Sequence, residues 1–388
     1  MKSAKYTAGI IVLSIIVFGM AYKMNKEIAP HRNPIDQSIS LNKNRPVTPG
    51  IAQTDPKFKD VAFGVETPER SPFSNQLAAV AKSIESFALP KKDGSPKERG
   101  SWIWTPTLFM TPEYIEEVLS GAESYGINAI YLSIDSYLDV FTMANGEEKE
   151  ALKKEFEDRL DLFIGEANKR GIAVDAEAGW QDWGEEGNIY KAFVIVNFVK
   201  NFNSSRVNKF RGFQYDVEPY LLSRYQEDKE SVLKNFVKLI DETEVFLSDT
   251  GLRFSVVLPD FFDGKDLATP KFSHKGAEDY AFGHVLSILD RRPDNSIIVM
   301  SYRNFAKGED GSIEISQNEM DTAKRRARNT KVIIAQETGE FPPLYITFHH
   351  TSQRYLARQI NELDAAFSSH PNFGGLAFHY INALIDLK

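Results

Sequence analysis

The chain has 388 residues, of which 42% are apolar, 26% charged and 12% aromatic, a composition that excludes a disordered protein and allows a large hydrophobic core. Asp and Glu number 54 against 46 Lys and Arg, and the net charge of -8 excludes the general attraction to phosphate that nucleic-acid binding requires. The chain contains no Cys, which excludes disulfides, thiolate catalysis and cysteine-ligated metal centres.

Residues 1–24 have the pattern of an export signal or a membrane anchor. Lys2 and Lys5 precede an uncharged, largely apolar run over 6–22. The run is shorter than the about 20 residues of a membrane span and longer than the about 7–15 residues of a signal-peptide core. We favour an uncleaved, single-pass anchor over a signal peptide that is cleaved after Ala21. In either case, we expect the rest of the chain to lie outside the cytoplasm.

Residues 25–74 are predicted to be an extended linker. The segment is polar, and its prolines are Pro30, Pro34, Pro46, Pro49, Pro56, Pro68 and Pro72. Proline at this density favours a semi-rigid, extended chain, which would hold the following domain away from a bilayer. The next segment, 75–89, has a helical pattern.

Beyond residue 100, short runs rich in Val, Ile, Phe and Tyr alternate with longer amphipathic segments. This alternation predicts parallel strands joined by helices. The predicted strands span 101–106, 128–135, 172–179, 212–218, 252–260, 295–302, 331–337 and 374–380. The clearest predicted helices span 111–126, 150–171, 228–251 and 354–370.

Eight strand-helix units favour an α/β fold of the (β/α)8 type, a TIM barrel, over residues 75–388. The alternative is an open, doubly wound sheet, which normally has a glycine-rich turn after its first strand. Residues 104–113 contain no glycine. Little sequence follows the last predicted strand, so we expect the helix at 75–89 to pack on the barrel in place of an eighth helix.

Carboxylates recur at the C-terminal ends of the predicted strands, where barrel enzymes have their active sites. They are Asp135, Asp175, Glu177, Asp216, Glu218, Asp260 and Glu337. Buried parallel strands are otherwise almost purely apolar, so this recurrence predicts a functional site, and carboxylates with aromatic side chains are typical of sugar chemistry. The side chains expected to bind a sugar are Trp104, Trp180, Asp135, Glu177, Asp260, Arg303 and His379.

The segment 215–220, Tyr-Asp-Val-Glu-Pro-Tyr, contains the strongest candidates for catalytic residues. Side chains two residues apart on a strand share a face, so Asp216 and Glu218 are both expected to point into the barrel mouth. Two carboxylates this close cannot both be ionised without a cost in free energy, and one of them therefore holds its proton more tightly. Glu218, nearer the strand end, is the better candidate for a general acid.

These residues resemble the chitinase-like family 18 glycoside hydrolases. Their fourth strand ends in D-x-x-D-x-D-x-E and their sixth strand has a Met-x-Tyr, matched here by Asp216, Glu218 and the Met300-Ser301-Tyr302 segment. The resemblance implies that Glu218 protonates the glycosidic oxygen. It also implies that Asp216 positions the N-acetyl group of the substrate as nucleophile and that Tyr302 helps to hold it. The chain departs from the motif at Arg211, Gln214 and Arg303.

A second resemblance is to the retaining clan A glycosidases, which have Asn-Glu-Pro at the end of strand four and a nucleophilic Glu at the end of strand seven. Glu218-Pro219 and Glu337 match these positions, and Val217 replaces the Asn. This resemblance implies that Glu218 is the acid/base and that Glu337 attacks the anomeric carbon, with the carboxyl groups about 5–5.5 Å apart.

The aromatic faces of Trp104 and Trp180 are expected to stack on sugar rings. The adjacent His349 and His350 follow the seventh strand in a segment that we expect to be extended. Neighbouring side chains would then face opposite ways, and no metal site is predicted there. No motif implies a required cofactor.

The sequence therefore predicts a membrane-tethered or exported glycoside hydrolase that acts on a polysaccharide or glycoconjugate. One alternative is a non-catalytic carbohydrate-binding barrel, in which the acids accept hydrogen bonds from sugar hydroxyls. The other is a carboxylate-metal hydrolase of another polymer, although the scarcity of His at strand ends disfavours it.

Overall fold

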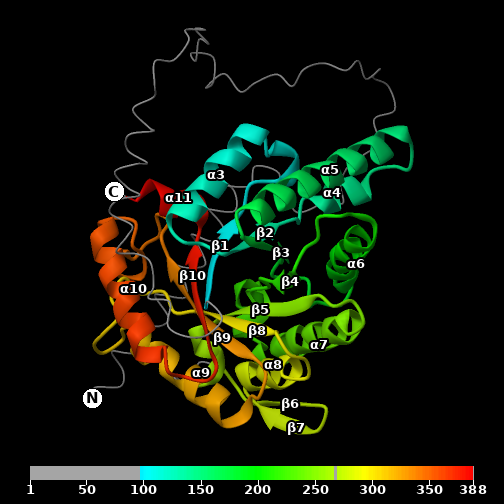
Figure 1. Cartoon of the computed structure of the whole chain (residues 1–388). Coiled ribbons are helices and arrows are strands. Elements are labelled where there is room, and N and C mark those ends of the chain that lie inside the picture. Colours follow the sequence, from blue (N-terminus) through cyan, green and yellow to red (C-terminus); the bar gives the residue numbers. More distant parts are fainter. Residues whose placement is uncertain (1–96, 266–268, 388) are drawn as a thin grey trace, which may run out of the picture.

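The computed structural model describes residues 97–265 and 269–387, and Figure 1 shows a ring of strands surrounded by helices. The strands close into a parallel barrel in the order β1-β10-β9-β8-β5-β4-β3-β2. They are β1 (Glu98–Ile103), β2 (Ala129–Ser133), β3 (Ala173–Ala178), β4 (Gly212–Tyr215), β5 (Arg253–Pro259), β8 (Ser296–Met300), β9 (Lys331–Glu337) and β10 (Phe373–His379). Each predicted strand overlaps one of these, and the predicted (β/α)8 barrel is confirmed.

The helices of the described part of the chain cover the outside of the barrel (Figure 1). They are α3 (Pro112–Ser124), α4 (Tyr137–Thr142), α5 (Glu147–Lys169), α6 (Ile189–Ser205), α7 (Lys229–Leu247), α8 (Ala281–Leu289), α9 (Ser312–Arg326), α10 (Gln353–Phe367) and α11 (Ile381–Asp386). The four predicted helices correspond to α3, α5, α7 and α10. Side chains of Thr111, Asp228 and Ser352 cap α3, α7 and α10 by accepting a backbone N–H of the first turn, which has no partner inside the helix.

A hairpin and a short helix near the end of the chain were not expected from the sequence. An antiparallel hairpin of β6 (Phe272–His274) and β7 (Ala277–Asp279) precedes α8, and the short helix α11 follows the last barrel strand. The helix expected at 75–89, the anchor and the linker lie outside the described residues. Within the part of the chain that the structure describes, no helix is both long enough and apolar enough to cross a membrane.

The pairing of β1 with β10 closes the barrel and requires a close backbone approach at Gly375. This residue has a φ of +139°, and a Cβ built on it would lie 1.9 Å from the carbonyl oxygen of Glu98. Only glycine adopts this conformation and tolerates this contact, so Gly375 is a structural requirement for closure.

The middle of the barrel interior is filled by one apolar and aromatic cluster. Its buried members are Trp102, Tyr131, Val257, Ile298, Ile333, Ala335 and Ala377. The indole N–H of Trp102 donates to Gln214 Oε1 at 2.8 Å, and Gln214 in turn donates to the Ser255 hydroxyl at 3.3 Å. The polar atoms of this level are therefore hydrogen-bonded within the barrel.

An ionic network fills the end of the barrel where the strands begin. Glu98 accepts hydrogen bonds from Arg253 at 2.6 and 2.8 Å, from Arg211 at 2.9 Å and from the Tyr131 hydroxyl at 2.6 Å. The fully buried Asp175 accepts two hydrogen bonds from Arg211, at 2.9 and 2.7 Å, and lies 3.0 Å from Arg253 Nε. The expectation that Asp175 lines the mouth is wrong, because its side chain points inward near the start of β3 and pairs with these two arginines.

We expect Glu98→Gln to lower the free energy of unfolding by about 3–5 kcal/mol, because Arg211 and Arg253 would lose a buried counter-charge. Burial raises the pKa of Glu98, but Arg253 and Arg211 outweigh this and lower it from 4.5 to about 2. A folded-state pKa below the unfolded value stabilises the fold above pH 4.5, and this contribution is lost as the pH falls towards 2. Urea denaturation at several pH values measures both effects.

The control is Glu166→Gln, which removes surface ion pairs with Lys169 and Arg170 on one helix and should cost less than about 1 kcal/mol. Equal destabilisation by the two variants at neutral pH would contradict the role given to Glu98.

Candidate active site

Glu337 and His379, the last residues of β9 and β10, form a hydrogen-bonded pair at the barrel mouth. They are direct partners in the strand register, and His379 Nδ1 lies 2.7 Å from Glu337 Oε2. The other oxygen, Oε1, accepts the backbone N–H of Gly339 at 2.6 Å. Both oxygens of this buried side chain are acceptors, as in a carboxylate, and the two donors fix its orientation.

Trp104 determines which nitrogen of His379 carries the proton. The indole N–H of Trp104 donates to His379 Nε2 at 3.0 Å. An accepting nitrogen has no proton, so this geometry describes the neutral ring with its proton on Nδ1, donated to Glu337. Burial lowers the pKa of His379, but the charges of Glu337, Asp216 and Glu218 outweigh burial and raise it. Taking up a second proton would break the Trp104 hydrogen bond, which opposes this upward shift.

Glu218 lies beyond the end of β4 and immediately precedes a 3-10 helix over Pro219–Leu221. Burial in the mouth raises the pKa of Glu218, and the Tyr220 hydroxyl and His379 reverse only part of the shift. The Tyr220 hydroxyl donates a hydrogen bond to Glu218 Oε1. A carboxyl group that keeps its proton to higher pH is suited to donate it to a leaving group.

Tyr302 and Asp216 complete the group of residues predicted to be catalytic. Burial and the negative charges of Glu337, Asp216 and Glu218 raise the pKa of Tyr302 well above its ordinary value. The Tyr302 hydroxyl therefore keeps its proton and is available as a donor. The charges of the same three carboxylates raise the pKa of both Tyr302 and His379, whose rings are 6.3 Å apart.

The two tryptophans expected to bind sugar lie in different surroundings. Trp104 packs against the cluster inside the barrel, with its ring 5.6 Å from His379. Trp180 packs instead against the larger core between the strands and the helices. The partly buried Tyr380, which was not predicted as a site residue, also packs inside the barrel, with its ring 5.4 Å from His379. Trp104 and Tyr380 are therefore aromatic neighbours of the Glu337–His379 pair, as are Trp102 and Tyr302, whose rings lie 5.8 and 6.3 Å from His379.

Asp135 and Glu177 lie at and below the mouth on neighbouring strands. Asp135 follows β2 and accepts the backbone N–H of Gly179 at 3.2 Å. Glu177 lies inside β3, and only 1% of its surface is exposed. A sugar in the mouth can reach Asp135 more directly than Glu177.

Arg303 follows β8, and its guanidinium group is held by Asp310 at 2.7 and 3.0 Å. It also lies over the Tyr345 ring, 5.6 Å from the ring centre. Burial lowers the pKa of Arg303, but the charges of Asp310 and Asp260 outweigh burial and raise it. Asp260 thus acts on Arg303 electrostatically, at the side of the mouth formed by β5 and β8.

Tyr220 is the main residue of the site that the sequence analysis missed. Its ring packs edge-on against Phe261 and Phe262, with centroid distances of 5.3 and 6.1 Å. Pro219 could have indicated the position of Tyr220 from the sequence, because proline is favoured at the first position of a helical turn. A tight turn directly after Glu218 places the Tyr220 side chain against the Glu218 carboxyl group.

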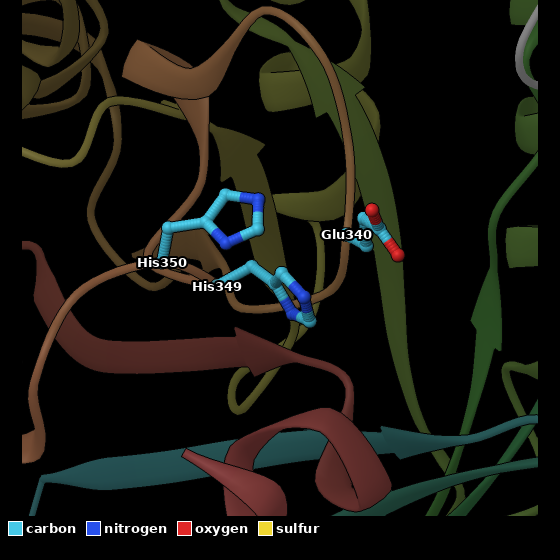
Figure 2. Close-up of side chains that lie close together, drawn as sticks. All are labelled: Glu340, His349 and His350. Atoms are coloured by element: carbon cyan, nitrogen blue, oxygen red, sulfur yellow. The ribbon is translucent and has the colours of Figure 1, made fainter. Parts of the chain in front are cut away.

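His349 and His350 do not face opposite ways, contrary to the sequence-based expectation. The backbone N–H of Thr351 donates to the carbonyl of Phe348 at 2.8 Å, so the two histidines occupy the centre of a turn, where neighbouring side chains share a side. Their rings are 4.5 Å apart, and Figure 2 shows them together with Glu340. Among the described residues, these three form the one group of His, Asp or Glu side chains close enough to share a metal ion.

We expect Tyr220→Phe to raise the pKa of the Glu218 carboxyl group further. The Tyr220 hydroxyl stabilises the ionised form of Glu218 and so lowers its pKa. Without this hydrogen bond, the pKa-raising effect of burial is larger. A carboxyl carbon NMR titration of both proteins measures the shift. Tyr345→Phe, which changes an exposed tyrosine whose ring contacts Arg303, is the control. An unchanged or lowered Glu218 pKa in Tyr220→Phe would contradict this assignment.

No protein-family model matches the chain, and no curated protein matches it. Solved structures with a similar fold include a chitinase from Chromobacterium violaceum, with 14% identity over 75% of this chain and 97% of the chitinase, at a TM-score of 0.46. An endo-1,4-beta-D-mannanase from Thermotoga petrophila has 13% identity over 74% of this chain and 88% of the mannanase, at a TM-score of 0.48.

A D-psicose 3-epimerase also has a similar fold, with 10% identity over 73% of this chain and 84% of the epimerase, at a TM-score of 0.39. The barrel thus resembles chitinases and mannanases at low sequence identity, and it resembles enzymes of other chemistry as well. At these scores the similarities carry no argument about activity, which has to come from the residues of the mouth.

Proposed function

We propose that the protein is a glycoside hydrolase that cleaves a polysaccharide or glycoconjugate, with Glu218 as the general acid/base. The observation that carries the proposal is the hydrogen bonding of two carboxyl groups: the Tyr220 hydroxyl donates to Glu218, and both oxygens of Glu337 accept hydrogen bonds. Burial also raises the pKa of Glu218. Glycosidases need one carboxyl group that carries a proton and a second that is negatively charged. Glu218 fits the first role and Glu337, which accepts hydrogen bonds at both oxygens, fits the second.

In the proposed reaction, Glu218 protonates the glycosidic oxygen as the bond to the anomeric carbon breaks. Glu337, oriented by His379 and Gly339, attacks the anomeric carbon and forms a covalent glycosyl-enzyme. Glu218 then takes a proton from the water that hydrolyses this intermediate. The protonated Tyr302 hydroxyl supplies a hydrogen-bond donor to the bound sugar.

The second candidate mechanism uses Asp216 instead of Glu337. The proposal is supported by the charge of Asp216, which contributes to the raised pKa of both Tyr302 and His379. In this mechanism, Asp216 orients the N-acetyl group of a substrate, which then attacks the anomeric carbon in place of an enzyme carboxylate. This version requires an N-acetylated sugar, whereas the Glu337 version does not.

We also propose that the barrel acts outside the cytoplasm. The support is the sequence pattern of residues 1–24 together with the proline-rich segment 25–74. A tethered barrel could reach a cell-surface or extracellular carbohydrate while the N-terminal segment stays in the membrane.

Glu218→Gln should lower kcat on the responsive polysaccharide by about 10²–10⁴ and leave binding intact, because an amide cannot donate the proton that the leaving group needs. The assay is a panel of glucan, chitin and peptidoglycan. In the wild type, activity should fall as the pH rises through the raised pKa of Glu218, since the acid loses its proton there.

Glu227→Gln is the matched control, because Glu227 is an exposed glutamate in the same β4–α7 loop, and it should keep full activity. Binding without turnover of any glycan by the wild type would instead support a non-catalytic carbohydrate-binding barrel.

Glu337→Gln and Asp216→Asn distinguish the two mechanisms. With Glu337 as nucleophile, Glu337→Gln abolishes turnover, and a 2-fluoro glycoside leaves a covalent sugar on Glu337 that mass spectrometry detects. With the substrate acetamide as nucleophile, Asp216→Asn is the more damaging change and no adduct forms. Loss of activity in neither variant would exclude both mechanisms.

A further inference from the structure

We propose that Glu340, His349 and His350 bind a divalent transition-metal ion, of which Zn²⁺ is the representative, at the rim of the barrel mouth. The three side chains are exposed, and each offers one ligand atom such that all three atoms lie within 4.8 Å of one another. Figure 2 shows the two imidazole rings beside each other and the carboxylate near them. This site is separate from the Glu337–His379 pair and does not depend on the proposed glycosidase activity.

The donor set suits this class of metal. Two imidazole nitrogens and one carboxylate oxygen are ligands that Zn²⁺ accepts, and three protein ligands leave a further position for water. Hard cations such as Ca²⁺ and Mg²⁺ prefer oxygen ligands only, so the two histidines favour a transition metal. Tetrahedral bonds of about 2.0–2.2 Å place ligand atoms about 3.4 Å apart. Small rotations of exposed side chains can close the remaining gap.

The backbone already holds the three ligands near each other. Thr347 pairs with Glu337 as an isolated parallel bridge, and its hydroxyl donates to the carbonyl of Gly339 at 2.5 Å. The N–H of His349 donates to the same hydroxyl oxygen at 3.1 Å. The segment before Glu340 and the segment before His349 are thus joined at the end of β9. A site assembled in this way loses little chain entropy when the ion binds.

A bound ion would cross-link the two ends of the loop over residues 340–350. Glu340 lies at its start and the two histidines at its end, so coordination would link residues that the Thr347 contacts bring together only through hydrogen bonds. Because the ion binds the folded loop and not the unfolded chain, it should raise the stability of the protein.

Zn²⁺ titrated into the full chain, followed by calorimetry, tests the proposal. We expect one ion per chain to bind with the highest affinity, and the thermal unfolding midpoint to rise with Zn²⁺ concentration. Glu340→Gln, His349→Asn and His350→Asn should each weaken this binding by at least about 10-fold, the loss that even an outer-shell partner causes, and should reduce the rise of the midpoint.

His370→Asn is the matched control, because it removes a histidine outside the group and should leave the affinity for Zn²⁺ unchanged. Circular dichroism verifies that each variant is folded. The proposal is overturned if the wild type binds no stoichiometric Zn²⁺, or if binding persists unchanged in the three variants. Neither the binding measurement nor the unfolding measurement uses a glycan. A negative result for Zn²⁺ binding therefore does not bear on the proposed glycosidase activity.

Discussion

The pairing of β1 with β10 is the constraint on which the rest of the structure depends, because it turns a sheet into a closed ring. In a closed barrel, alternate side chains of every strand must point into one narrow interior. Gly375 allows the closing strands to approach each other where any Cβ would collide with the carbonyl of Glu98. Once the ring is closed, the position of a residue along its strand decides how far its side chain lies from the mouth.

Three chemically different levels follow from this geometry. At the bottom, Glu98 and Asp175 pair with Arg211 and Arg253, and the cost of removing the carboxylates from water is offset because each has several partners. In the middle, Trp102 and its apolar neighbours fill the barrel, with Gln214 accepting the indole N–H. The interior is therefore packed up to the level at which the strands end, and a second group of titratable side chains lies above it at the mouth.

The carboxyl groups at the mouth would repel each other if all were ionised, and the residues around them differ. Partial burial in the mouth raises the pKa of Glu218, and the Tyr220 hydroxyl reduces this shift. Glu337 accepts hydrogen bonds from His379 and Gly339 instead. The two carboxyl groups thus have different hydrogen-bond partners, as general acid/base and nucleophile roles require.

The alternation of strand and helix, and with it the barrel, could be predicted from the sequence because both depend on local periodicity. The gathering of Asp216, Glu218 and Glu337 at strand ends followed from that topology. The sequence did not reveal that Asp175 faces the opposite end, since its direction depends on arginines that precede or begin other strands. The turns that bring Tyr220 to Glu218 and His349 beside His350 are local, but the carboxylate of Glu340 joins the two histidines only because the contacts of Thr347 bring the two segments together. Period and composition are properties of the chain, whereas the partners of a polar side chain are known only when distant segments meet.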